Sequence, residues 1–150
     1  MKILLSVVST KRADLNGPAA ALLQLYLKRA TRYTPCDLRV FPSETKLLGF
    51  VADATTRTRP VLLLADSRGQ QLSSEDLAAA LGSFQDAGAQ QLIFAIGPAD
   101  GWSSAALAAA TRTVAFGRIT LPHELAAVIA AEQLYRALTI RAGHPYHSRH

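Results

Sequence analysis

Short runs of leucine and β-branched residues alternate with segments of helical periodicity along the whole chain, and this alternation constrains the fold most. Such runs are typical of strands that are covered on both faces of a sheet. The expected strands cover residues 2–8, 37–41, 60–65, 91–96 and 114–116. Strand–helix alternation favours an α/β fold with a mostly parallel sheet and helices on both faces. No repeat or linker divides the sequence, so we expect one domain over residues 1–150.

Helix start signals lie between the expected strands. The expected helices begin at Pro18, near Lys46, at Ser73 or Ser74, at Ser103 or Ser104, and at Pro122. In the first helix the larger apolar side chains, Leu22, Leu25 and Tyr26, follow one another at helical spacing. In the last helix the larger apolar side chains predict one buried face, made of Leu125, Val128, Ile129, Leu134, Tyr135 and Leu138. Gly143 is expected to stop this helix.

Three loops follow the expected strands at their carboxyl ends, where open α/β sheets bind ligands. They cover residues 66–69, which we expect to form a turn, then 97–101 and 117–121. Glycines in these loops let backbone groups approach a flat polar ligand closely. A single loop of this kind is more often only a tight turn, but three at one sheet edge favour a small-molecule pocket.

The C-terminal tail carries ionisable side chains that can take part in proton transfer. Histidine titrates near neutral pH and is the natural general base, so we favour His144 or His147. Further candidates are Tyr146, Arg136 and His123. Arg136 has a simpler interpretation as a residue that packs and pairs at a dimer interface, and His123 as one that caps the helix or faces solvent. His144, His147 and His150 also suggest a metal site, but no further ligands lie at a recognised spacing, so we expect no metal.

Three blocks of the C-terminal part occur together: LPH at residues 121–123, EQLYRA at 132–137 and HPYH at 144–147. Their order and spacing resemble the RlmH family of SPOUT-class methyltransferases, and the likeness extends over most of the chain. Members of that family methylate N3 of a pseudouridine in bacterial large-subunit ribosomal RNA. The resemblance therefore implies an S-adenosylmethionine-dependent methyltransferase, a homodimer and an α/β-knot fold with a C-terminal trefoil knot.

The resemblance also implies which residues hold the cofactor. In the family, backbone groups of the second and third loops clasp the adenine, and the tail of one subunit reaches the cofactor pocket of its partner. The implied cofactor-binding positions are Ala65, Ile96, Gly97, Pro98, Gly101, Gly117, Arg118, Ile119, Thr120, Leu121 and Pro122. The implied catalytic group is His144, His147, Tyr146 and Arg136.

Some positions depart from the family pattern. Relatives have a second glycine where this chain has Pro98, a leucine where it has Ala65, and an arginine where it has Ala127, and residues 42–59 form a shorter segment. Proline has no N–H to donate and cannot adopt a positive φ. These departures favour an alternative function, a weakly active or non-catalytic RNA- or ligand-binding homodimer. A nucleotide-binding α/β protein of another kind is disfavoured, because no Gly-x-Gly-x-x-Gly follows the first strand and no Walker lysine is present.

Composition limits the partners and the compartment. The formal net charge of +5 favours a polyanionic partner such as ribosomal RNA, and Lys28, Arg29 and Arg32 are either phosphate contacts or a solvated helix end. Only 18% of residues are charged, which favours self-association. Cys36 is the one cysteine, so an intrachain disulfide is excluded. No apolar run is long enough for a membrane span, and we expect a cytoplasmic protein without a membrane partner.

Overall fold

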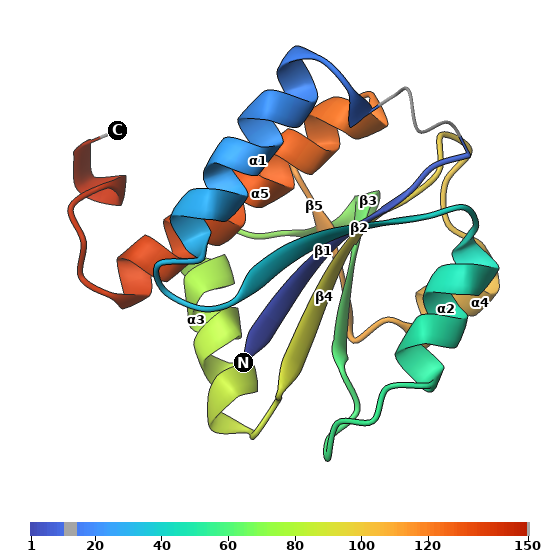
Figure 1. Ribbon diagram of the computed structural model, residues 1–150, viewed down its shortest axis with the longest axis horizontal. Helices are drawn as coiled ribbons and strands as arrows, with labels where there is room; N and C mark the ends of the chain where they lie inside the picture. The colour runs from blue at the N-terminus through green and yellow to red at the C-terminus, as the bar shows by residue number, and fades with distance from the viewer. Residues whose placement is uncertain (11–14, 150) are drawn as a thin grey trace.

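The computed structural model describes residues 1–10 and 15–149 and contains a five-stranded sheet with helices on both faces (Figure 1). The strands are β1 (Lys2–Val8), β2 (Cys36–Phe41), β3 (Val61–Gln71), β4 (Gln91–Ile96) and β5 (Arg112–Ala115). They lie in the order β2-β1-β4-β3-β5, and every pairing is parallel. Because parallel neighbours need crossover connections, helices separate the strands in sequence. The α/β class and the parallel sheet are confirmed.

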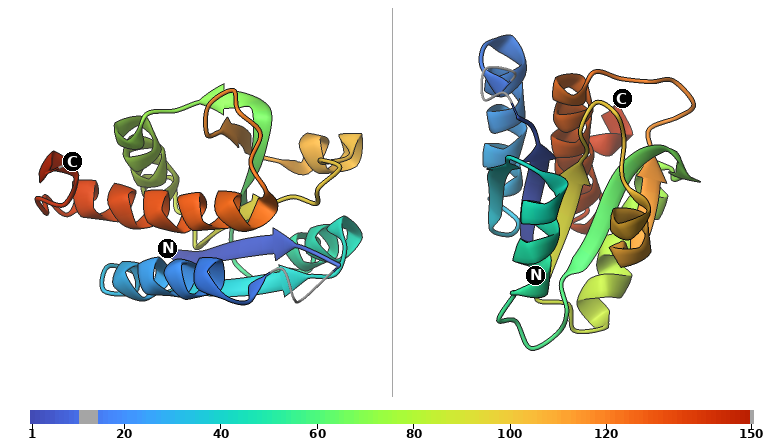
Figure 2. Two further views of the ribbon diagram at one scale, coloured as in Figure 1. Left: turned by 90° about the horizontal axis from the view of Figure 1, so that it is seen from above. Right: turned by 90° about the vertical axis from the view of Figure 1, so that its right-hand side faces the viewer.

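The helices form two layers around the sheet. One face is covered by α1 (Pro18–Ala30), α3 (Ser74–Asp86) and α5 (His123–Arg141), and the other by α2 (Glu44–Ala52) and α4 (Ser104–Ala109) (Figures 1 and 2). Successive strand residues point to opposite faces. Ile3 and Leu5 therefore lie in the core under α1, α3 and α5, while Leu4 and Val8 lie in the core under α2 and α4.

The buried face of α5 matches the prediction only at Leu134 and Tyr135, and in α1 the leucines noted at helical spacing are not the buried ones. Helix α1 buries Leu23, Leu27 and Ala30, whereas Leu22 and Leu25 are each 42% exposed. Helix α5 buries small side chains together with Leu134 and Tyr135; the small ones are Ala127, Ala130, Ala131, Ala137 and Thr139. Small residues let α1 and α5 approach each other closely. Leu125, at 48% exposure, is therefore left on the outside.

Residues 66–69 were predicted to form a turn that ends the third strand, and this prediction is wrong. Strand β3 continues to Gln71, and both Ala65 and Gln70 pair with Val114 of β5, so residues 66–69 bulge out of the ladder. The strand returns to β5 at Gly69, where a Cβ would lie 2.7 Å from the carbonyl carbon of Thr113. Only glycine permits this approach.

The remaining boundaries lie close to the predicted ones. Strand β5 begins and ends slightly earlier than expected, and Pro122 is the N-cap of α5 instead of its first residue. Ser73 caps α3, and its side chain and that of Asp76 form a capping box. The prediction that α5 stops at Gly143 is confirmed: the N–H groups of Gly143 and His144 donate to Ile140 and Thr139, at a glycine φ of +70°.

Candidate functional site

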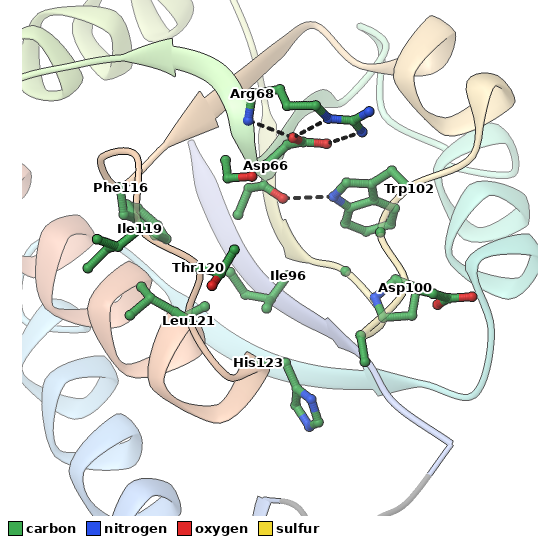
Figure 3. Close-up of a pocket in the computed structure, with 17 residues that line it drawn as sticks. Asp66, Arg68, Ile96, Asp100, Trp102, Phe116, Ile119, Thr120, Leu121 and His123 are labelled. Atoms are coloured by element: carbon green, nitrogen blue, oxygen red, sulfur yellow. Dashed lines mark hydrogen bonds and ion pairs between the residues drawn. The ribbon is translucent and has the colours of Figure 1, made fainter.

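A cavity of about 400 Å³ lies at the carboxyl ends of β4 and β5, beside the bulge of β3 (Figure 3). Its walls come from this bulge, from the loop between β4 and α4, and from the loop between β5 and α5, which are the three segments that the sequence indicated. These segments meet because parallel strands end at the same edge of the sheet. The volume lies within the usual range of small-molecule sites.

Most of the predicted cofactor-binding residues line this cavity. They are Ala65, Ile96, Gly97, Pro98, Gly101, Ile119, Thr120 and Leu121. Gly117, Arg118 and Pro122 belong to the same loop as Thr120 but are not among the lining residues. Five further lining residues lie in segments that the sequence indicated but were not assigned to the cofactor, namely Asp66, Ser67, Arg68, Ala99 and Asp100. His123 was named only as a catalytic candidate, and Trp102, Phe116 and Ala126 were not named as candidates. A role of any of these residues in cofactor binding stays a prediction.

Pro98 fits the loop after β4 without strain. Its carbonyl accepts a hydrogen bond from the N–H of Gly101 at 3.0 Å, which closes a tight turn. The positive φ in this loop, +87°, belongs to Gly101 and not to position 98. The turn therefore needs glycine three residues later than the family pattern suggested, and proline at position 98 is compatible with it.

Trp102 connects two walls of the cavity and was not predicted. Its indole Nε1–H donates to the carbonyl oxygen of Ala65 at 2.8 Å, and the residue is only 7% exposed (Figure 3). The ring also packs on Gly97, where a Cβ would lie 2.7 Å from the indole. The bulky indole thus packs beside Ala65, where the family pattern has a larger side chain. A lone tryptophan directly after a loop glycine was the available sequence signal.

Helix α2 fixes the same loop from the other side. The Glu44 carboxylate accepts hydrogen bonds from the backbone N–H of Ser103, at 2.8 Å, and from the Ser103 hydroxyl. Ser103 is also the N-cap of α4, because its hydroxyl oxygen accepts from the N–H of Ala106. The segment from Gly97 to Ser103 is therefore held at both ends.

A charged pair stands on the bulge of β3. The Asp66 carboxylate accepts from the backbone N–H of Arg68 at 2.8 Å and from its guanidinium Nε and Nη2 at 3.1 and 3.0 Å. These hydrogen bonds lower the pKa of Asp66, so it is ionised at neutral pH. The Asp66 side chain is 7% exposed and that of Arg68 72% exposed, so the cavity has a buried anion with a guanidinium at its rim.

The predicted catalytic residues gather at the opposite end of α5 from the cavity. Glu132 Oε1 accepts from Arg136 Nη2 at 2.6 Å and from the Tyr146 hydroxyl at 2.9 Å, and the Arg136 guanidinium lies over the Tyr146 ring. His147 begins a short 3₁₀ turn (His147–Arg149) and contacts both Arg136 and Glu75. Arg136, Tyr146 and His147 thus form one cluster, but none of them lines the cavity of their own chain.

The two tail histidines differ in their surroundings. His144 is exposed, and its Nδ1 accepts from the backbone N–H of Tyr146 at 3.1 Å. His147 is half-buried, and both of its ring nitrogens have side-chain partners. His123 lies apart from the tail, at the start of α5, and lines the cavity.

Other sequence-based expectations concern positions outside the cavity. Ala127 is completely buried, so the side chain at this position faces the core and not a ligand or RNA. Lys28 and Arg32 are exposed, while the Arg29 guanidinium lies 5.5 Å from the centre of the Tyr26 ring. Within residues 1–10 and 15–149, no group of three or more metal-ligating side chains comes together and no helix is long and apolar enough to span a bilayer. His150 lies outside the described residues.

Known proteins are similar to this chain in sequence over most of its length. Residues 1–147 match the model of a family described as "Predicted SPOUT methyltransferase". Among its relatives, the chain is 52% identical to the ribosomal RNA large subunit methyltransferase H of Koribacter versatilis, over 83% of this chain and 85% of the relative. It is 40% identical to the protein of the same name from Methylocella silvestris, over 98% of this chain and 99% of the relative.

Solved structures share the fold at low sequence identity. The SpoU methyltransferase AviRb of Streptomyces viridochromogenes, solved in complex with AdoMet, superimposes with a TM-score of 0.56 at 16% identity. The alignment covers 95% of this chain, which spans 58% of that structure. A probable methylase family protein of Haemophilus influenzae gives a TM-score of 0.59 at 10% identity and covers 96% of this chain and 69% of its own. These likenesses show the fold alone.

Proposed function

Because the chain belongs to the SPOUT methyltransferase family, we propose that it is an S-adenosylmethionine-dependent methyltransferase acting on large-subunit ribosomal RNA. The observation that carries the proposal is the cavity, formed by the bulge of β3 and the loops after β4 and β5, in a chain 52% identical to a ribosomal RNA large subunit methyltransferase H. Following the resemblance of the LPH, EQLYRA and HPYH blocks, we propose N3 of a pseudouridine as the methylated atom.

The cavity residues have the chemistry that this cofactor needs. Ile96, Phe116 and Leu121 offer apolar walls for a flat purine, and the loops around them present backbone donors and acceptors. Asp66 and Asp100 place carboxylates in a site whose ligand carries a positive sulfur and an ammonium group. A cavity of about 400 Å³ is adequate for a nucleoside joined to an amino acid.

When bound, S-adenosylmethionine supplies a methyl group on a positively charged sulfur, whose C–S bond breaks as the new C–N bond forms. The chain must therefore hold donor and acceptor in line. In the substrate, the N3 proton has to pass to a base or to water before or during transfer. Loss of this proton leaves a negative charge on the pseudouridine ring. Nearby cations and donors stabilise this charge, a role for which Arg136 is suited.

Among the tail residues, His144 is the better candidate for the base. Tyr146 is unsuited, because burial and its hydrogen bond to Glu132 raise the pKa of the phenol and keep it neutral at physiological pH. His147 has both nitrogens engaged by side chains. His144 is exposed and has one backbone contact to break, at a cost of about 1 kcal/mol.

The tail does not line the cavity of its own chain. Tyr146 and His147 contact Glu132 and Arg136, whereas the cavity reaches only Ala126 at the start of α5; from Ala126 to Arg136 the helix rises by about 15 Å, at about 1.5 Å per residue. In a dimer whose two-fold axis is perpendicular to α5, the two copies of α5 run in opposite directions. The tail of one copy then lies near the cavity of the other. We therefore propose a homodimer in which each site combines the cavity of one subunit with the tail of its partner.

The surface that we propose for the dimer lies on α1 and α5. Leu22 and Leu25 of α1 and Leu125 of α5 are large, apolar and between 42% and 48% exposed. Leu22, Leu125 and Val128 also line a shallow groove between the starts of the two helices. Apolar side chains gathered in this way are typical of a surface that a second copy covers. Family membership further supports a single knotted domain and a cytoplasmic location beside the ribosome.

Titration calorimetry with S-adenosylhomocysteine tests the proposal, since product binding requires the cavity but not the RNA. Saturable binding supports it, together with methylation of large-subunit ribosomal RNA that contains the pseudouridine but lacks its N3 methyl group. Absence of binding at millimolar ligand would favour the non-catalytic RNA-binding dimer instead. In the same assays, His144→Ala and His147→Ala should each lower turnover more than cofactor affinity, and unchanged turnover in both variants would contradict the assignment of the tail histidines.

A further inference from the structure

Glu75, in the first turn of α3, lies in contact with the C-terminal tail although 72 residues separate it from His147 in sequence. Its Oε1 is 2.8 Å from His147 Nε2, and the other ring nitrogen, Nδ1, is 3.2 Å from Arg136 Nη1. The imidazole is thus placed between a carboxylate of α3 and a guanidinium of α5. Neither the family resemblance nor the cavity assigns a role to Glu75.

The two contacts define which nitrogen of His147 carries the proton. A guanidinium has only donors, so Nδ1 must accept from Arg136. A neutral imidazole with an accepting Nδ1 has its hydrogen on Nε2, and this hydrogen then points to the Glu75 carboxylate. In this arrangement the lone pair on Nδ1 accepts from Arg136, and the N–H of Nε2 donates to Glu75. His147 therefore has no free lone pair with which to act as a base.

Both partners of His147 are themselves held in place. Glu132 Oε1 accepts from Arg136 Nε and Nη2 at 3.0 and 2.6 Å and also from the Tyr146 hydroxyl. At the other end, the capping box fixes the start of α3, and the Ser74 hydroxyl donates to Gln133 of α5 at 2.7 Å. Polar contacts therefore run without interruption from α3 through His147 and Arg136 to Tyr146.

We propose that Glu75 is a positioning residue for methyl transfer, which orients His147 and thereby seats the C-terminal tail of its subunit. The inference rests on the proposed function, in which this tail completes the site of the partner subunit. In support, the hydrogen bond from His147 lowers the pKa of Glu75, so the acceptor is ionised at neutral pH. Because Glu75 does not line the cavity, its loss should disturb the geometry of transfer more than the binding of the cofactor.

The test compares Glu75→Ala and Glu75→Gln with Asp86→Ala, which removes an exposed carboxylate from the far end of the same helix. Glu75→Ala should lower kcat by about tenfold or more, since small misplacements of reacting groups have effects of this size. The dissociation constant for S-adenosylhomocysteine should change by less than about threefold. Glu75→Gln keeps an acceptor oxygen and should recover part of the rate, and Asp86→Ala should match the wild type.

A second readout does not depend on activity. In ¹⁵N-labelled wild-type protein, the His147 ring should show a single neutral form with hydrogen on Nε2, and in Glu75→Ala the two neutral forms should interconvert. An unchanged His147 signal in Glu75→Ala, or wild-type kcat in that variant, would overturn the inference. A wild-type protein that binds no cofactor and methylates no RNA would instead refute the proposed function, while the ¹⁵N signals would still decide whether Glu75 orients His147.

Discussion

Replacing Gly97 by alanine tests the packing on which the cavity depends. The new Cβ would lie 2.7 Å from Cε2 of Trp102 and 3.0 Å from its Nε1, whereas ordinary contacts begin at 3.4 Å. The indole must therefore move by about 0.7 Å, the difference between 3.4 and 2.7 Å. It has little room, because it is 7% exposed and bonded to the Ala65 carbonyl at 2.8 Å.

We expect Gly97→Ala to lower the free energy of unfolding by about 2–3 kcal/mol, combining overpacking with a weakened hydrogen bond. For a chain of this length, the melting temperature should fall by about 4–12 °C. The displaced ring also moves two walls of the cavity, so the affinity for S-adenosylhomocysteine should fall by about tenfold or more. Trp102 is the one tryptophan, so its fluorescence reports directly on the change.

Two further variants separate this mechanism from a general effect of alanine. Gly49→Ala lies in α2, where a Cβ would meet nothing within 4 Å, and should stabilise the protein by about 0.5–1 kcal/mol. In a Trp102→Leu background the clashing ring is absent, so Gly97→Ala should cost clearly less stability there than it does in the wild type. A Gly97→Ala protein with wild-type melting temperature, fluorescence and cofactor affinity would refute the packing argument.

Three other predictions address the helix cap, the cysteine and the dimer. Ser73→Ala removes the capping box of α3 and should cost about 1 kcal/mol in chemical denaturation, whereas Ser83→Ala, at an exposed position of the same helix, should be nearly neutral; equal effects would contradict the cap. Burial raises the pKa of Cys36 from 9.0 to about 12, so its contribution to stability is complete below pH 9 and is lost as the pH rises toward 12. The free energy of unfolding, measured by urea denaturation, should therefore decline less between pH 9 and 12 in Cys36→Ala than in the wild type. An identical decline in the two proteins would refute this. Leu125→Glu should shift sedimentation from dimer to monomer without lowering the melting temperature of the monomer, and an intact dimer would exclude this face as the interface.

The sequence predicts the sheet well and the helix faces poorly, for a physical reason. Strands buried on both faces are continuous apolar runs, so the range 91–96 could be predicted without reference to any partner. A helix face is chosen by what packs against it. Alanines such as Ala130 and Ala131 carry little hydrophobic signal, yet they are completely buried because close packing of α5 against its neighbours requires small side chains.

The candidate site, too, could be predicted from the sequence only in part. Loop positions such as Gly97 and Leu121 could be found from strand ends and glycines, because topology brings strand ends together. The roles of Trp102 and Glu44 could not be predicted in this way, since they depend on hydrogen bonds across the fold to Ala65 and Ser103. The contact between His147 and Glu75 likewise joins two helices whose mutual placement no local pattern encodes.

Mixing two inactive variants measures most directly whether each site combines one subunit's cavity with its partner's tail. Leu121→Trp fills the cavity, and the triple replacement of His144, Tyr146 and His147 by alanine disables the tail. Random exchange of subunits makes half of the dimers mixed, each with one intact composite site. The account therefore predicts recovery of about a quarter of wild-type methylation. No recovery, although mixed dimers are shown to form, would contradict it.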